Sequence, residues 1–133
     1  MSQMLRVLGI IMFFASPASA ASAASLLGTW AAEPDSKGQV GHIDITPCGA
    51  ALCGTIVRIF DKAGQPATTP NLGRRILRDV TQTGPNTYDG GKVYVPILGA
   101  EFNVDITLTG NSLKLSACNA LSVCRSQRWR RVP

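Results

Sequence analysis

The sequence has a single histidine, His42, and it has no serine elbow, glycine-rich phosphate loop or group of several histidines. These absences argue against the common sites for nucleophilic catalysis, nucleotide binding and multi-histidine metal binding. No segment beyond the N-terminus shows a helical period over a useful length, and no internal repeat is present. A mixed aromatic and basic motif of the kind that binds nucleic acid is also missing.

Long hydrophobic runs are absent except at the N-terminus. Residues 1–20 carry Arg6, then an apolar run over residues 7–15, then the small residues Ala18-Ser19-Ala20. This pattern predicts a secretory signal peptide, cleaved after Ala20 or as late as residue 23 or 24, where small residues recur. The run of ~9 residues is too short for a spanning helix, which needs ~20. We therefore expect a single periplasmic or secreted domain over residues 25–133, with no membrane span.

Charge gives a weak indication of partners. Without Arg6 the chain has 12 basic and 8 acidic residues, so its net charge is about +4. Two clusters hold most of the arginines: Arg74, Arg75 and Arg78, and Arg125, Arg128, Arg130 and Arg131. They form either a solvated basic surface or a surface that attracts anionic lipid or polysaccharide. Nucleic acid is not an expected partner of an exported chain.

The four cysteines form two local pairs, Cys48 with Cys53 and Cys118 with Cys124. An even number in an exported protein predicts disulfides, although the sequence leaves three connectivities open. Pairing within each local pair needs the least rearrangement of the chain, so the disulfides Cys48–Cys53 and Cys118–Cys124 are favoured. A four-cysteine zinc site is the alternative, but the usual two-residue knuckle is missing. No metal and no other cofactor are expected.

Alternation of apolar and polar residues is strictest over residues 101–108. It predicts a half-buried strand, and Gly110-Asn111 predicts a tight turn into a second alternating strand over residues 112–117. Residues 41–46 and 53–60 predict another hairpin around the first cysteine pair. Further strands are expected at residues 27–32, 75–80, 92–95 and 125–132.

About eight short strands joined by local turns predict an all-β domain, either a sandwich or an antiparallel up-and-down barrel. The barrel is favoured, because a series of hairpins needs no long crossover and closure protects both edge strands. The connection over residues 61–73 is expected to be a loop at the barrel mouth.

Four segments together form a sequence pattern specific enough to compare with known families: Gly28-Thr29-Trp30, PCGAALCGTIV at residues 47–57, GGKVYVPILGAEF at 90–102 and CRSQRWRRV at 124–132. In these segments the chain resembles the bacterial secreted family filed as domain of unknown function 2147. The resemblance implies an exported lipocalin-like, or calycin-like, barrel with no agreed activity. It further implies that the barrel is closed by Gly28, Trp30, Trp129 and Arg131, with the Trp30 ring under the Arg131 guanidinium. A Trp30 that is ordinary core without this arginine is the alternative.

The chain departs from that family in the stretch from Tyr94 to Gly99. The family usually has an acidic residue between this tyrosine and the proline, followed by a polar turn, whereas this chain has Ile97 and Leu98 after Pro96. Exposed apolar residues often mark contact sites. Ile97 and Leu98 therefore predict a hydrophobic rim that contacts a lipid-like ligand or an envelope partner, the alternative being that they fold back onto the mouth.

An eight-stranded barrel is either filled by its own side chains or holds one small ligand. The candidate ligand-binding residues of the lumen and rim are Ile43, Ile45, Val57, Ile59, Ile97, Leu98, Phe102, Val104, Ile106, Leu113 and Leu115. We expect non-catalytic binding of a small hydrophobic molecule. The alternative is a cell-envelope interaction module with a solid barrel, which engages a protein or an anionic surface.

Enzymatic activity is a third hypothesis. His42 and Asp44 share one face of a strand, where a carboxylate would orient the imidazole. Ile43 and Ile45 occupy the buried face, however, which leaves the pair in solvent. We therefore expect no catalytic residues.

Overall fold

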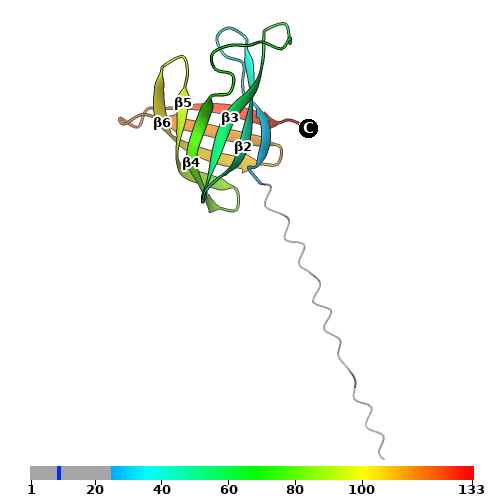
Figure 1. The fold of residues 1–133 in the computed structure, drawn as a ribbon. Coiled ribbons are helices and arrows are strands. Elements are labelled where there is room, and N and C mark those ends of the chain that lie inside the picture. Colours follow the sequence, from blue (N-terminus) through cyan, green and yellow to red (C-terminus); the bar gives the residue numbers. More distant parts are fainter. Residues whose placement is uncertain (1–8, 10–24) are drawn as a thin grey trace, which may run out of the picture.

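Eight strands follow one another around a closed antiparallel barrel in the computed structural model, which describes residues 9 and 25–133 (Figure 1). The strands are β1 (Gly28–Ala31), β2 (Val40–Cys48), β3 (Ala51–Phe60), β4 (Arg75–Gly84), β5 (Thr87–Val95), β6 (Ala100–Thr109), β7 (Ser112–Cys118) and β8 (Cys124–Arg131). Each strand pairs with the next, and β8 pairs with β1. The predicted up-and-down barrel is confirmed. The predicted signal peptide, Gly9 apart, lies outside the described residues.

Local turn chemistry explains the hairpins. Gly110 has φ +58° in the two-residue turn between β6 and β7, as the Gly-Asn pair predicts. β4 and β5 are longer than predicted: β4 continues to Gly84 and β5 begins at Thr87, around a turn at residues 85–86. The polar sequence of this region hides the two strands, although Val80 and Tyr88 from them are buried.

Consecutive turns of an up-and-down barrel lie at opposite ends. The β2–β3, β4–β5 and β6–β7 turns therefore share one end, which we call the closed end. The other end, which we call the mouth, carries the connections over residues 32–39, 61–74, 96–99 and 119–123. The long loop after β3 was predicted at the mouth, and its Asn71 lines the cavity there.

The closed end is sealed by the segment that precedes β1. Trp30 is fully buried, and its Nε1 donates to the carbonyl oxygen of Leu26 at 3.0 Å. Leu26 is also fully buried, and its backbone N–H donates to the hydroxyl of Tyr88 at 3.3 Å. The guanidinium of Arg131 covers the Trp30 ring at 4.3 Å from the ring centroid, which confirms the predicted arrangement.

β1 closes the barrel through a short contact. The described residues form two residue pairs between β1 and β8, which are Trp30 with Arg131 and Ala31 with Arg130. β8 begins six residues before Arg130, so its first half extends toward the mouth beyond the end of β1. We call the space beside residues 124–129 of β8, which precede the paired Arg130, the seam.

A bulge between β2 and β3 overturns one predicted orientation. His42 pairs with Arg58 and Ile43 pairs with Ile56, so Val57 has no partner on β2. The extra residue reverses the alternation. Ile56 and Ile59 are consequently buried, whereas Val57, predicted to point into the lumen, is 39% exposed.

Two disulfides brace hairpins at opposite ends. Cys48–Cys53 spans the β2–β3 turn, and Cys118–Cys124 joins the end of β7 to the start of β8. Both favoured pairings are confirmed, and the zinc alternative is wrong because the sulfurs are bonded to each other. Cys118 and Cys124 also pair in the strand register, so the second disulfide fixes the beginning of β8.

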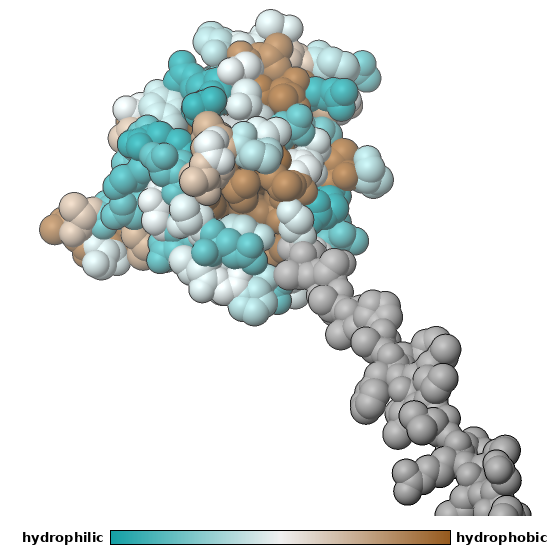
Figure 2. Space-filling view, turned by 60° about the horizontal axis from the view of Figure 1, so that its bottom comes forward, coloured by the Kyte–Doolittle hydropathy of each residue, from teal (hydrophilic) through white to brown (hydrophobic). Residues whose placement is uncertain are grey.

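Exposed hydrophobic residues gather locally on the surface. Figure 2 shows hydrophilic residues over much of one face and hydrophobic residues gathered near its middle. The turn between β7 and β8 carries Leu121 and Val123, which are 83% and 62% exposed. In the described part of the chain, no helix is long and apolar enough to cross a membrane.

Candidate functional site

A cavity of about 990 Å³ opens at the mouth of the barrel. All four mouth connections contribute to its edge, through residues such as Pro34, Asn71, Ile97 and Asn119. Its walls come from the inner faces of the strands. The barrel is therefore hollow in the half near the mouth and sealed at the other end.

The walls are largely apolar. The aliphatic and aromatic strand residues that line the cavity include Ile56, Ile59, Ile76, Val93, Tyr94, Val95, Phe102, Leu115, Ala117 and Trp129. Ile56, Ile59 and Ile76 are 6–8% exposed, and Trp129 is 3% exposed. Such walls suit a ligand with a hydrophobic body.

β8 contributes a polar line within these walls. Its alternate residues Arg125, Gln127 and Trp129 all line the cavity. They pair in register with Ala117, Leu115 and Leu113 of β7. The Nε1 of Trp129 donates to Oε1 of Gln127 at 3.0 Å, which occupies the carbonyl oxygen of Gln127 and leaves its amide NH₂ group for other partners.

The acidic groups at the edge of the cavity accept hydrogen bonds from backbone amides. Oε1 of Glu33 accepts from the N–H of Arg128 at 3.2 Å, across the seam. Oδ1 of Asp35 accepts from the N–H groups of Lys37 and Gln39 at 2.8 and 2.9 Å, which closes the β1–β2 connection into a tight turn. These bonds hold both carboxylates to their own loop and to the edge of β8.

The predicted lumen and rim residues divide into three groups. Ile59, Ile97, Leu98, Phe102 and Leu115 line the cavity. Ile43, Ile45, Val104, Ile106 and Leu113 are at most 2% exposed and do not line it, so they form the packed half toward the closed end. Val57 lies outside the barrel wall. The rim residues Ile97 and Leu98 are 76% and 61% exposed, so they stand at the mouth and are not folded into it.

The residues predicted to close the barrel lie in two different places in the structure. Gly28, Trp30 and Arg131 meet at the closed end, where Arg131 donates to the carbonyl oxygens of Leu27 and Ser25 at 2.9 and 2.6 Å. Trp129, which was grouped with them, lines the cavity instead. Its position two residues before Arg131 on the same inner face of β8 is the signal that would have placed it there.

The His42–Asp44 pair is not assembled for catalysis. The hydroxyl of Thr29 donates to the Asp44 carboxylate, and the His42 ring packs against Phe60 at a centroid distance of 4.8 Å. Nδ1 of His42 is buried and has no hydrogen-bond partner among the residues that the structure describes. Burial, and secondarily the charge of Arg58, lower the pKa of His42 from its ordinary value of 6.5. Neither His42 nor Asp44 lines the cavity.

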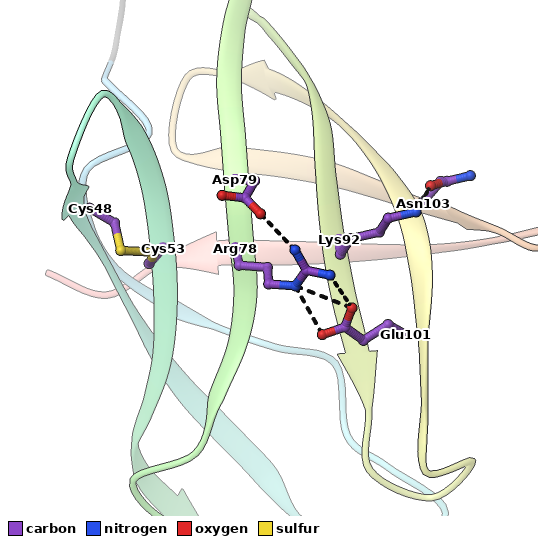
Figure 3. Close-up of polar contacts among 7 residues, drawn as sticks. All are labelled: Cys48, Cys53, Arg78, Asp79, Lys92, Glu101 and Asn103. Atoms are coloured by element: carbon purple, nitrogen blue, oxygen red, sulfur yellow. Dashed lines mark hydrogen bonds and ion pairs between the residues drawn. A yellow bond between two sulfur atoms is a disulfide. The ribbon is translucent and has the colours of Figure 1, made fainter.

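The first arginine cluster is partly neutralised on the outside of the barrel (Figure 3). Nε of Arg78 donates to Oε1 of Glu101 at 3.0 Å, its Nη2 donates to Oε2 at 2.6 Å, and its Nη1 donates to Asp79 at 2.7 Å. These bonds raise the pKa of Arg78, and Arg78 lowers the pKa of Glu101. Arg74 lies over the ring of Tyr94 at 4.9 Å. This cluster therefore offers less free positive charge than the sequence suggests.

No metal centre is formed by the residues that the structure describes, because no three His, Cys, Asp or Glu side chains gather there. The four cysteines are all in disulfides. The polar side chains that line the cavity include one guanidinium, one ammonium, two carboxylates, several amides and the hydroxyls of Ser36 and Tyr94, which can bind and orient a ligand.

Comparisons with known proteins agree with this architecture. The model of a family described as "Uncharacterized protein conserved in bacteria (DUF2147)" matches residues 28–131. The solved structure of protein HP1028 from Helicobacter pylori, described as belonging to the lipocalin family, is similar with a TM-score of 0.66 and 17% sequence identity. That similarity covers 82% of this chain and 84% of the other, and at this identity it shows the fold. No curated protein matches the sequence.

Proposed function

The chain belongs to the DUF2147 family of bacterial proteins, and we propose that it is an exported lipocalin-like barrel that binds a small hydrophobic ligand without chemistry. The observation that carries the proposal is the cavity of about 990 Å³ with apolar walls, open at one end only. Ligand pockets in proteins typically span about 300–1,000 Å³ and combine apolar walls with a few polar groups.

Export is the second part of the proposal. Two disulfides favour an oxidising compartment, because the cytosol keeps thiols reduced. The bacterial family and the predicted signal peptide point in the same direction, toward the periplasm or the outside of the cell. In either place a barrel with a protected lumen would carry an apolar molecule through water.

A second candidate function is supported by the hairpin tips. Ile97 and Leu98 of the β5–β6 turn and Leu121 and Val123 of the β7–β8 turn are all more than 60% exposed. Exposed apolar residues at neighbouring turns suit an envelope interaction module that engages a protein or an anionic surface. The sequence-based form of this hypothesis expected a solid barrel. A hollow barrel is equally compatible with it, because the hairpin tips would make the contacts with the partner.

Titration of the mature protein with the neutral fluorophore N-phenyl-1-naphthylamine tests ligand binding. We expect saturable binding of one probe per chain. Ala117→Phe places a large side chain into the cavity and should abolish binding, because Ala117 lines it. Lys114→Phe adds the same side chain to an exposed position of the same strand and should leave binding unchanged.

Native mass spectrometry of protein purified from its own envelope would then identify the ligand class after solvent extraction. A reproducible bound lipid or metabolite supports a carrier. An empty chain that also fails to bind the fluorophore contradicts the proposal and directs the search toward partners of the hairpin tips.

A further inference from the structure

The cavity contains a cation with no anionic partner. Arg125 lines the wall at the mouth end of β8. Among the described residues, the ion pairs within 4.0 Å involve Arg78 and its two carboxylates only. Arg125 is exposed at the mouth, and it brings to the cavity edge a guanidinium without an ion-pair partner, whose planar set of donors fits a carboxylate or phosphate.

The nearby acids are already bound. Glu33 accepts from the backbone N–H of Arg128, and Asp35 accepts from two backbone N–H groups of its own turn. Lys37 also lines the cavity and adds a second basic group to its lining. The hydrogen bonds hold the two carboxylates toward the backbone without neutralising them, whereas the Arg125 guanidinium has no hydrogen-bond partner among the described residues.

The order of residues along β8 gives the site a direction. Alternate residues of a strand are ~7 Å apart, which places Gln127 ~7 Å and Trp129 ~13 Å beyond Arg125. The amide NH₂ of Gln127 has no protein acceptor among the described residues, since its carbonyl oxygen is the group bonded to Trp129. Deeper in the cavity the surroundings become apolar, with Trp129 and Leu115.

We propose that the cavity takes an amphipathic anion, with its acidic head group on Arg125 and Gln127 at the mouth and its hydrocarbon tail against Trp129. This inference rests on the proposed function and narrows its ligand from a hydrophobic molecule to an acid with a tail. The disulfide Cys118–Cys124 supports the head-group site, because Arg125 directly follows Cys124 and its backbone is fixed there.

Displacement of bound N-phenyl-1-naphthylamine tests the inference, because this probe carries no charge. At pH 8 and low salt, we expect dodecanoate to displace it at about tenfold lower concentration than dodecanol, which has the same tail. Dodecyl phosphate should behave like dodecanoate. The preference should decrease with added salt, since the head group lies at an open mouth.

Arg125→Gln should remove the preference for the acids while leaving displacement by dodecanol unchanged. Arg125→Lys should keep part of it, since the charge remains and the paired donors are lost. Arg128→Gln is the matched control, because Arg128 is on the same strand but does not line the cavity.

Two negative results have different meanings. Equal displacement by acid and alcohol, or an unchanged preference in Arg125→Gln, would overturn this inference and leave the proposed function intact. Failure of the neutral probe to bind would overturn the proposed function, and this inference with it.

Discussion

The guanidinium of Arg131 lies across the Trp30 ring, 4.3 Å from its centroid, and at the same time donates to the carbonyl oxygens of Leu27 and Ser25. One side chain from the last strand thus holds both the first strand and the segment before it. A stacked contact and two charge-assisted hydrogen bonds converge on a single residue.

Arg131→Gln should lower the free energy of unfolding by about 2 kcal/mol, because it removes the stacked contact and the paired donors. Urea denaturation followed by tryptophan fluorescence measures the change. Arg130→Gln alters the neighbouring exposed arginine and should change stability little. Equal effects of the two substitutions would contradict a special role for Arg131.

Gly28→Ala should be destabilising by about 1–3 kcal/mol, because Gly28 has φ +125° and a Cβ there would lie 3.0 Å from Nη1 of Arg131. Gly41→Ala is the control, since a Cβ at Gly41 would meet its nearest atoms at 3.9 and 4.0 Å. Thermal unfolding of both variants measures the difference. Similar melting temperatures would show that Gly28 is not required by this close approach.

Ile97→Asp should weaken binding of N-phenyl-1-naphthylamine about fivefold or more, because it replaces an apolar group at the edge of the cavity with a charge. Leu121→Asp makes the same change at the β7–β8 tip, which is 83% exposed and does not line the cavity. It should leave probe binding unchanged. Unaltered binding by Ile97→Asp would exclude the rim from the ligand site.

His42 should make the protein less stable in mild acid. Its folded pKa is lowered by burial and by Arg58, so below pH 6.5 the unfolded chain binds a proton that the folded chain does not. The free energy of unfolding should therefore fall as the pH decreases from 6.5 toward the folded pKa, and should not change through His42 above that range. His42→Gln should reduce this slope in urea titrations at several pH values. Parallel slopes for the two proteins would contradict the assignment.

Most of the fold could be predicted because short-range rules decide it. The alternation over residues 101–108, the Gly110-Asn111 turn and the two cysteine pairs each have a local cause, and each is confirmed. Val57 could not be placed, because the bulge that turns it outward depends on its pairing with β2. Periodicity alone assigns every second residue to one face and carries no information about an extra one.

The candidate site was harder to predict, because the lumen is filled by side chains in the half near the closed end and hollow in the half near the mouth. Ile43 and Ile59 have the same side chain, yet one lies in the packed half and the other lines the cavity. Arg125 and Gln127 were missed as cavity residues because β8 is polar on both faces near the mouth. Only the register with β7 shows which of its arginines point inward.

β1 is four residues long, and this shortness determines how the barrel can deform. At the mouth, the residues that the structure describes form no ladder of backbone hydrogen bonds between β8 and β1, and they are linked across the seam by the hydrogen bond from the N–H of Arg128 to Oε1 of Glu33. We therefore expect the mouth to deform more easily at the seam than the closed end, where the Arg131 guanidinium covers the Trp30 ring. On this basis the closed end would act as a rigid base, and a ligand wider than the mouth would be accommodated by deformation along the seam.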